Sequence, residues 1–106
     1  MRYRVVRLML FFDLPTLTSN DRRNYRQFRK ELIKEGFLMI QESVYVRIVT
    51  NKLTAEFMEK RLSSIAPEEG IIQTLIVTEK QYASMKFLAG EQIDDVRNSD
   101  DKVVVI

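Results

Sequence analysis

The sequence predicts an α+β fold in which two helices pack on one face of a mainly antiparallel sheet. A nearly continuous apolar run over residues 5–12 stops shortly before a proline, which is typical of a central strand. Residues 18–21 and 51–54 carry helix-start signals ahead of helix-length segments. Two further strand-like runs are separated only by Glu42 and Ser43, and so short a connection permits only an antiparallel hairpin.

Asp13 follows the first apolar run, at the point where the chain turns out of the predicted core. A carboxylate at the end of a buried strand loses hydration unless an arginine, a group of backbone amides or a metal ion meets it. The alternative is a turn-forming or helix-capping aspartate before a proline. Asp13 is therefore a candidate functional residue with a structural alternative.

The first helix is expected over residues 20–35, ending at Gly36 in the left-handed conformation. At 100° per residue, its apolar residues Tyr25, Phe28 and Leu32 fall on one face. Another face carries a basic stripe that consists of Arg23, Arg26, Lys30 and Lys34. Solvent is the usual environment of such side chains, but four cations on one ridge also suit contact with a phosphate backbone.

The rest of the predicted core contains strands over residues 36–41, 44–49 and 71–77, and a second helix that ends before Pro67. The second helix is expected to carry four apolar residues near one face, namely Leu53, Phe57, Leu62 and Ile65. The order strand, helix, strand, strand, helix, strand is the ferredoxin-like plan. In that plan both helices cover one face of the sheet and leave the other face uncovered.

The uncovered face is expected to carry alternate residues of the first strand and of the second hairpin strand. These residues are Arg7, Met9 and Phe11 together with Tyr45 and Arg47. The set is too apolar for water and too polar for the core of a monomer, so we expect it to form a homodimer interface. The dimer would bring two copies of Asp13 into one cleft.

The ferredoxin-like core is expected to span residues 1–78, with a C-terminal extension over residues 79–106. The extension begins with a capping box and a short helix, continues through an acidic segment, and ends in a terminal strand. That strand consists of Val103, Val104, Val105 and Ile106. Because an unpaired β-branched tail is an aggregation hazard, we expect it to pair with a sheet edge of the sister subunit or of another protein.

The composition narrows the possible chemistry. The chain has no cysteine and no histidine, which excludes disulfides, zinc thiolate sites, thiol nucleophiles and imidazole bases. Residues 1–34 hold nine Lys or Arg against three Asp or Glu, a net charge of +6, while residues 35–106 hold eight against twelve, or −4. Attraction to a polyanion is therefore expected for residues 1–34.

No apolar run is long enough to span a bilayer, and the early arginines argue against a signal peptide. The expected location is therefore cytoplasmic, with no membrane partner.

Together these features resemble the Cas-two family, the small second protein associated with CRISPR systems. The matching motifs are Phe-Phe-Asp at residues 11–13, Gly-Phe at residues 36–37 and Gln-Glu-Ser-Val-Tyr at residues 41–45. The motifs cover residues 3–49, and the element order extends the resemblance to about residue 78. The first strand and residues 78–81 resemble the branch that accompanies Cas9-type (type II-A) systems.

The resemblance implies a homodimer that bridges two dimers of the Cas-one integrase during spacer acquisition and holds a double-stranded protospacer DNA along its basic surface. The expected phosphate-contacting residues are Arg22, Arg23, Arg26 and Lys30, with Arg2 and Arg4 as further contributors. In family members described as nucleases, the aspartate that matches Asp13 binds Mg²⁺ between the subunits and is treated as catalytic.

The favoured function is thus a non-catalytic DNA-binding scaffold, and the alternative is a Mg²⁺-dependent endonuclease that acts on RNA or DNA through Asp13. A two-metal phosphodiesterase needs more carboxylates than two copies of Asp13, and the nearest other acid, Asp21, is as well suited to cap a helix. An RNA-recognition module shares the element order but needs two stacking aromatics where residues 44–49 offer only Tyr45. A small-ligand regulatory domain also shares the plan, but no glycine-rich ligand loop is evident.

Overall fold

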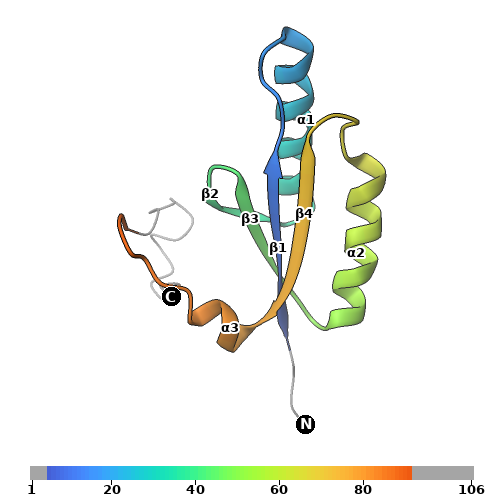
Figure 1. Cartoon of the computed structure of the whole chain (residues 1–106). Helices are drawn as coiled ribbons and strands as arrows, with labels where there is room; N and C mark the ends of the chain where they lie inside the picture. Colours follow the sequence, from blue (N-terminus) through green and yellow to red (C-terminus); the bar gives the residue numbers. More distant parts are fainter. Residues whose placement is uncertain (1–4, 92–106) are drawn as a thin grey trace.

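A computed structural model describes residues 5–91 and contains one four-stranded antiparallel sheet with the strand order β2-β3-β1-β4 (Figure 1). The elements in chain order are β1 (Val6–Asp13), α1 (Ser19–Lys34), β2 (Leu38–Gln41), β3 (Val44–Val49), α2 (Lys52–Ile65), β4 (Ile71–Thr78) and α3 (Glu79–Ala83). This order confirms the predicted ferredoxin-like plan. β1 is an inner strand, as its apolar sequence predicted.

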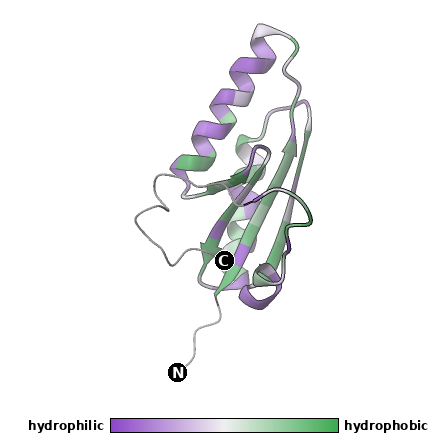
Figure 2. Cartoon of the chain, turned by 90° about the vertical axis from the view of Figure 1, so that its left-hand side faces the viewer, coloured by the Kyte–Doolittle hydropathy of each residue, from purple (hydrophilic) through white to green (hydrophobic). Residues whose placement is uncertain are grey.

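The hydrophobic core lies between the sheet and the two long helices. Alternate residues of β1, namely Leu8, Leu10 and Phe12, are buried there. They pack with Phe28 and Leu32 of α1 and with Ala55, Met58 and Leu62 of α2. Both helices therefore cover the same face of the sheet, and Figure 2 shows hydrophobic strands beside an α1 that is hydrophilic along most of its length.

The ends of α1 match the sequence signals. The Thr18 side chain accepts a hydrogen bond from the Asp21 amide at 3.0 Å, and the Asp21 carboxylate accepts one from the Thr18 amide at 3.1 Å. This reciprocal pair is a capping box, which satisfies amides that the first helical turn leaves without partners. At the other end, Gly36 has φ +93°, the left-handed conformation that stops the helix.

The four apolar residues predicted near one face of α2 do not form its buried face, with the exception of Leu62. The buried residues are Ala55, Met58 and Leu62, whereas Leu53 is 76% exposed and Phe57 is 68% exposed. Ile65 is also exposed. The spacing of three and four residues holds for the buried set, but its first member is a small alanine, which lets the helix approach the sheet closely. The largest apolar side chains of α2 therefore do not mark the face that packs on the sheet.

The prediction that Tyr45 and Arg47 lie on the uncovered sheet face is also wrong. β3 pairs with β1 so that Tyr45 is opposite Leu10 and Arg47 is opposite Leu8. Residues directly opposite each other in an antiparallel pair point to the same face, so both side chains lie beneath the helices. Arg47 donates from Nη1 to the Glu35 carbonyl at 2.8 Å, at the C-terminal end of α1. The strands were correctly predicted, but the pairing register was not.

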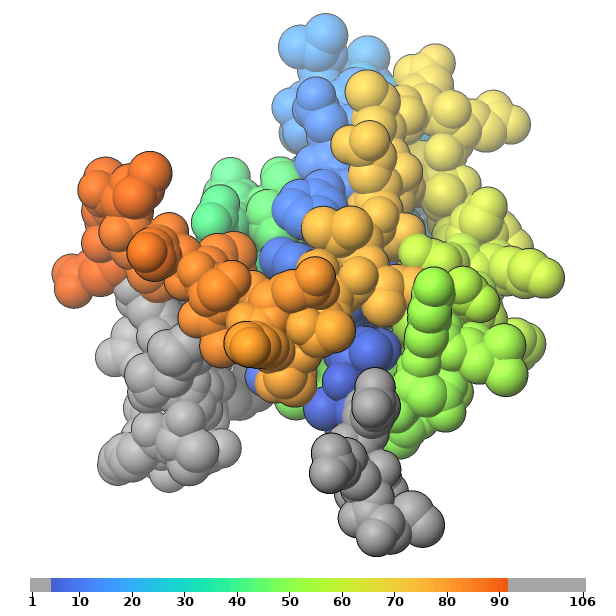
Figure 3. Space-filling model, turned by 60° about the horizontal axis from the view of Figure 1, so that its bottom comes forward, coloured from blue at the N-terminus to red at the C-terminus, as the bar shows by residue number. Residues whose placement is uncertain are grey.

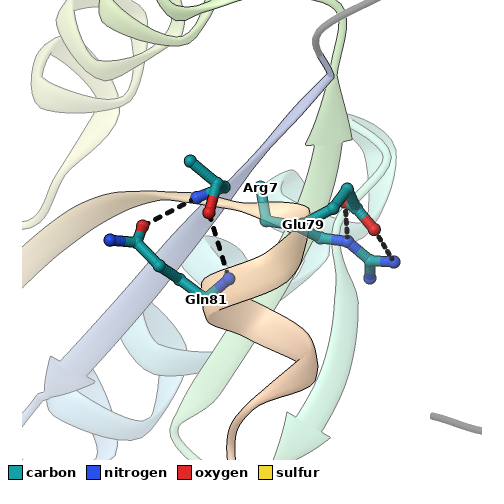
Figure 4. Close-up of polar contacts among 4 residues, drawn as sticks. Arg7, Glu79 and Gln81 are labelled. Carbon is teal, nitrogen blue, oxygen red and sulfur yellow. Dashed lines mark hydrogen bonds and ion pairs between the residues drawn. The ribbon is translucent and has the colours of Figure 1, made fainter.

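α3 and residues 84–91 lie at the other face of the sheet, at the end where β4 finishes (Figures 1 and 3). Arg7 of β1 holds α3 through a two-pronged ion pair with Glu79, at 2.6 and 3.1 Å. The Arg7 guanidinium also lies 4.2 Å from the centre of the Tyr82 ring. Thr78 and Gln81 form the predicted capping box beside this ion pair (Figure 4).

Several predictions fall on residues outside the described range of 5–91. They concern Arg2, Arg4 and the predicted terminal strand over residues 103–106. Within the described range, no helix is both long enough and apolar enough to cross a membrane.

Gly70, at the start of β4, packs tightly against the end of β1. A Cβ atom there would lie 2.5 Å from Leu14 Cδ2 and 2.8 Å from the Asp13 carbonyl oxygen, and the residue has φ +105°. We expect Gly70→Ala to lower the free energy of unfolding by about 3 kcal/mol, from steric overlap and positive-φ strain together. Urea unfolding followed by circular dichroism measures this.

Gly90→Ala is the matched control, because Gly90 has φ +81° and no atom within 4 Å of a built Cβ. It should cost about 1 kcal/mol or less, from φ strain alone. If both variants lower the free energy of unfolding by the same amount, the close packing of β1 on Gly70 does not contribute to stability.

Candidate nucleic-acid interface

Four of the cationic residues predicted for nucleic-acid contact lie on the solvent side of α1. Arg22, Arg23, Arg26 and Lys30 are exposed, and Lys34 continues the set to the end of the helix. The buried residues of α1, Phe28 and Leu32, point the opposite way. The 3.6-residue period of the helix therefore separates its apolar and cationic sides, as the sequence predicted. These five residues form the basic face of α1.

Arg22 is tied to the loop that precedes the helix. Its Nη1 atom donates to the Thr16 carbonyl at 3.2 Å and to the Leu17 carbonyl at 3.1 Å. These bonds restrict the orientation of the guanidinium and leave its other N–H groups directed away from those carbonyls. Thus one of the predicted phosphate-contacting residues also shapes the β1–α1 loop.

Arg29 belongs beside the basic face, and sequence reasoning missed it. It follows Arg26 by three residues and Arg22 by seven, a spacing that puts the three side chains along one line of the helix. That spacing can be seen in the sequence, whereas the tertiary contact of Arg29 cannot. Arg29 donates from Nε to the Tyr45 hydroxyl at 2.9 Å, and the Tyr45 side chain is fully buried in the core.

The side of α1 next to the β1–α1 loop has the opposite character. A cleft of about 560 Å³ lies between α1 and the α2–β4 loop, with Leu14, Pro15 and Phe28 among its apolar lining residues. Its carboxylates are Asp21, Glu31, Glu68 and Glu69. The four carboxylates repel a polyanion on this side of α1. Phosphate contacts are therefore favoured on the basic face.

Asp13 is exposed at the last position of β1, opposite Ile71 of β4. The neighbouring acid, Asp21, caps α1, so the capping alternative for Asp21 is confirmed. Among residues 5–91, no group of three or more His, Cys, Asp or Glu side chains is close enough to hold a metal ion. A Mg²⁺ ion at Asp13 would therefore need water, substrate phosphates or ligands from a second copy to complete its coordination.

Arg7, Met9 and Phe11 of β1 lie on the sheet face opposite the two long helices, as predicted, and Met9 is already buried within the single chain. Cross-strand pairing adds residues of β3 and β4 that the sequence did not identify as neighbours: Val44, Val46, Ile48, Ile71, Gln73, Leu75 and Val77. Ile48, Ile71 and Leu75 are each more than half exposed. The face is thus more apolar than predicted, because it carries alternate apolar residues of β3 and β4 in place of Tyr45 and Arg47.

Comparison with known proteins agrees with this architecture. Residues 6–85 match the family model described as CRISPR associated protein Cas2. A protein of Lacticaseibacillus rhamnosus is 57% identical over 101 residues, covering 95% of this chain and all of the relative. Relatives from Ligilactobacillus salivarius and Treponema denticola, with the same coverage, are 55% and 44% identical. All three bear the name CRISPR-associated endoribonuclease Cas2. The chain, with its ferredoxin-like sheet and its exposed aspartate at the end of β1, therefore belongs to the Cas2 family of CRISPR-associated proteins.

Proposed function

We propose that this protein is a non-catalytic scaffold of CRISPR spacer acquisition. In this role a homodimer bridges two dimers of the Cas-one integrase and holds a protospacer DNA duplex along its basic faces. The observation that carries the proposal is the basic face of α1, where five exposed cations lie along about three and a half turns of one helix. The family membership of the chain supports the CRISPR context.

The chemistry of the basic face favours recognition of the DNA backbone over recognition of base sequence. Arginine and lysine contact phosphate oxygens and release condensed counterions, which gives affinity that falls with salt. The exposed edge of α1 adds Gln27 and Ile33 to these cations. α1 is also held to the sheet by Arg47 and Arg29, which fixes the position of the basic face. We therefore propose sequence-independent binding to duplex DNA.

The dimer in this proposal forms through the uncovered sheet face. Its exposed apolar residues toward the Asp13 end, Ile71 and Leu75, match the hydrophobic centre that stable interfaces bury. Because α3 is held by Arg7 at one end of this face, contact between two copies would use the part of the sheet nearer Asp13. Two opposed faces would bring two Asp13 carboxylates near each other and leave both basic faces outside.

An endoribonuclease is the second candidate function, favoured by the names of the relatives and by the exposure of Asp13. Mg²⁺ would enter this candidate at Asp13, with water, substrate phosphates or Asp13 of a second copy as its further ligands. The ion would supply a nucleophilic water and charge neutralisation. Asp13 would hold the ion, and the basic face would bind the nucleic-acid backbone.

Reversing charge on the basic face should weaken DNA binding. We expect Arg23→Glu with Arg26→Glu to lower the affinity for duplex DNA at least about tenfold near 0.1 M salt, irrespective of sequence. The salt slope should fall by about two, one for each lost phosphate contact. Fluorescence anisotropy with two unrelated duplexes over a salt series measures both quantities.

The matched control is Lys52→Glu with Lys60→Glu, which makes the same change in net charge on exposed positions of α2. It should retain most of the affinity. Equal weakening by the two pairs would mean that only net charge matters, and unchanged binding by the α1 pair would remove the basic face from the proposal.

Asp13→Ala separates the two candidate functions. If the endoribonuclease function holds, this substitution should abolish cleavage of RNA and DNA substrates with Mg²⁺ or Mn²⁺, and leave the dimer and duplex binding intact. Denaturing gel electrophoresis measures cleavage, and anisotropy measures binding. Asp21→Asn, which removes a capping charge from α1, serves as the control that keeps cleavage. A wild-type protein that cuts nothing across a range of pH would contradict this second candidate.

The bridging role makes a prediction about stoichiometry. Co-expression with the neighbouring integrase should yield a complex with four integrase chains for each pair of chains of this protein. Native mass spectrometry of the co-purified complex gives that ratio. An integrase that co-purifies at one chain per chain, or not at all, would contradict the bridge while leaving DNA binding to be judged by the charge-reversal experiment.

A further inference from the structure

One arginine of α1 is anchored in the protein core by a buried tyrosine. The Tyr45 ring lies 5.7 Å from Phe12, measured between ring centres, and Tyr45 is fully buried on β3. Its hydroxyl reaches the edge of the core and accepts the hydrogen bond from Arg29 Nε at 2.9 Å. The phenol oxygen is therefore a fixed point, held by the sheet, from which the guanidinium extends outward.

The bond leaves the outer edge of the Arg29 guanidinium available. An arginine carries five N–H donors, of which Nε supplies one and the two terminal nitrogens supply four. Among residues 5–91, the hydrogen bond found for the Arg29 side chain is donated by Nε. The edge between the two terminal nitrogens presents one N–H from each, and this pair can bind two oxygens of a phosphate in a bidentate manner.

The charge of Arg29 is not neutralised along its own helix. Its neighbours at three and four residues on either side are Tyr25, Arg26, Leu32 and Ile33, and none is acidic. Lys34, by contrast, has Glu31 three residues away. Arg22 and Arg26 lie on the same line of the helix, so Arg29 extends a row of three arginines, and both ends of this row are tethered within the protein.

We propose that Arg29 contacts a phosphate of the bound nucleic acid and that Tyr45 is its positioning residue. This inference rests on the proposed binding of duplex DNA and adds to it a contact that depends on the core. A free arginine side chain loses considerable rotamer entropy when it binds, and a side chain already held at Nε loses less. The Tyr45 hydroxyl thus contributes to affinity without touching the ligand.

The test combines two substitutions in a double-mutant cycle with a random-sequence duplex as the probe. Arg29→Ala should lower affinity about fivefold to tenfold and reduce the salt slope by about one. Tyr45→Phe should lower affinity about twofold to fourfold, because the guanidinium is retained but no longer held. In the Arg29→Ala background, Tyr45→Phe should have no further effect on affinity.

Stability supplies an independent readout. Arg29→Ala leaves a buried hydroxyl without its partner, so Tyr45→Phe in that background should restore thermal stability while leaving affinity low. Arg29→Lys, which keeps the charge but lacks Nε, should lose affinity nearly as Arg29→Ala does. Tyr25→Phe is the matched control, because its ring also packs on Phe12, at 5.6 Å, and it should change neither affinity nor salt slope.

The outcomes separate this inference from the proposed function. Full affinity for Tyr45→Phe, or for Arg29→Ala, overturns the inference, and so does an Arg29→Lys variant that binds like wild type. If these variants bind normally while Arg23→Glu with Arg26→Glu weakens binding, the DNA-binding function stands without Arg29. If no variant on α1 weakens binding, the proposed function fails as well.

Discussion

The register between β1 and β3 determines how the rest of the molecule is arranged. Because Leu10 lies opposite Tyr45 and Leu8 opposite Arg47, both polar side chains of β3 lie under the helices. Each then bonds to α1: Tyr45 to Arg29 within the helix, and Arg47 to the Glu35 carbonyl at its end. A slip by one residue would turn both side chains to the other face and leave α1 without these anchors. The orientation of the basic face depends on this pairing.

The position of α1 also separates charges of opposite sign on its two sides. Cations lie along the basic face, while the other side of the helix borders a cleft whose carboxylates come from α1 and from the α2–β4 loop. The small net charge of +2 hides this separation. The local electrostatic potential at each side of α1, more than the net charge of the chain, determines where an anionic polymer is attracted.

The uncovered sheet face and Asp13 form the second region to which we assign a role in the proposed assembly. The face is apolar near Ile71 and Leu75 and closed at its other end by α3, which Arg7 holds through Glu79 and Tyr82. Gly70 allows β4 to begin close to the end of β1, and this contact supports the backbone at Asp13. Asp13 is exposed at this place, which leaves its carboxylate accessible to a ligand or to a second copy.

The sequence by itself determined the element order, the capping boxes at Thr18 and Thr78, the stop at Gly36 and the basic face of α1. These features follow from local rules, since backbone geometry and helical periodicity act over a few residues. Only the tertiary structure decided that Tyr45 and Arg47 lie beneath α1, that α2 packs through Ala55, and that Arg29 meets a buried hydroxyl. Strand register and helix approach depend on contacts between residues far apart in the chain, and no local pattern encodes them.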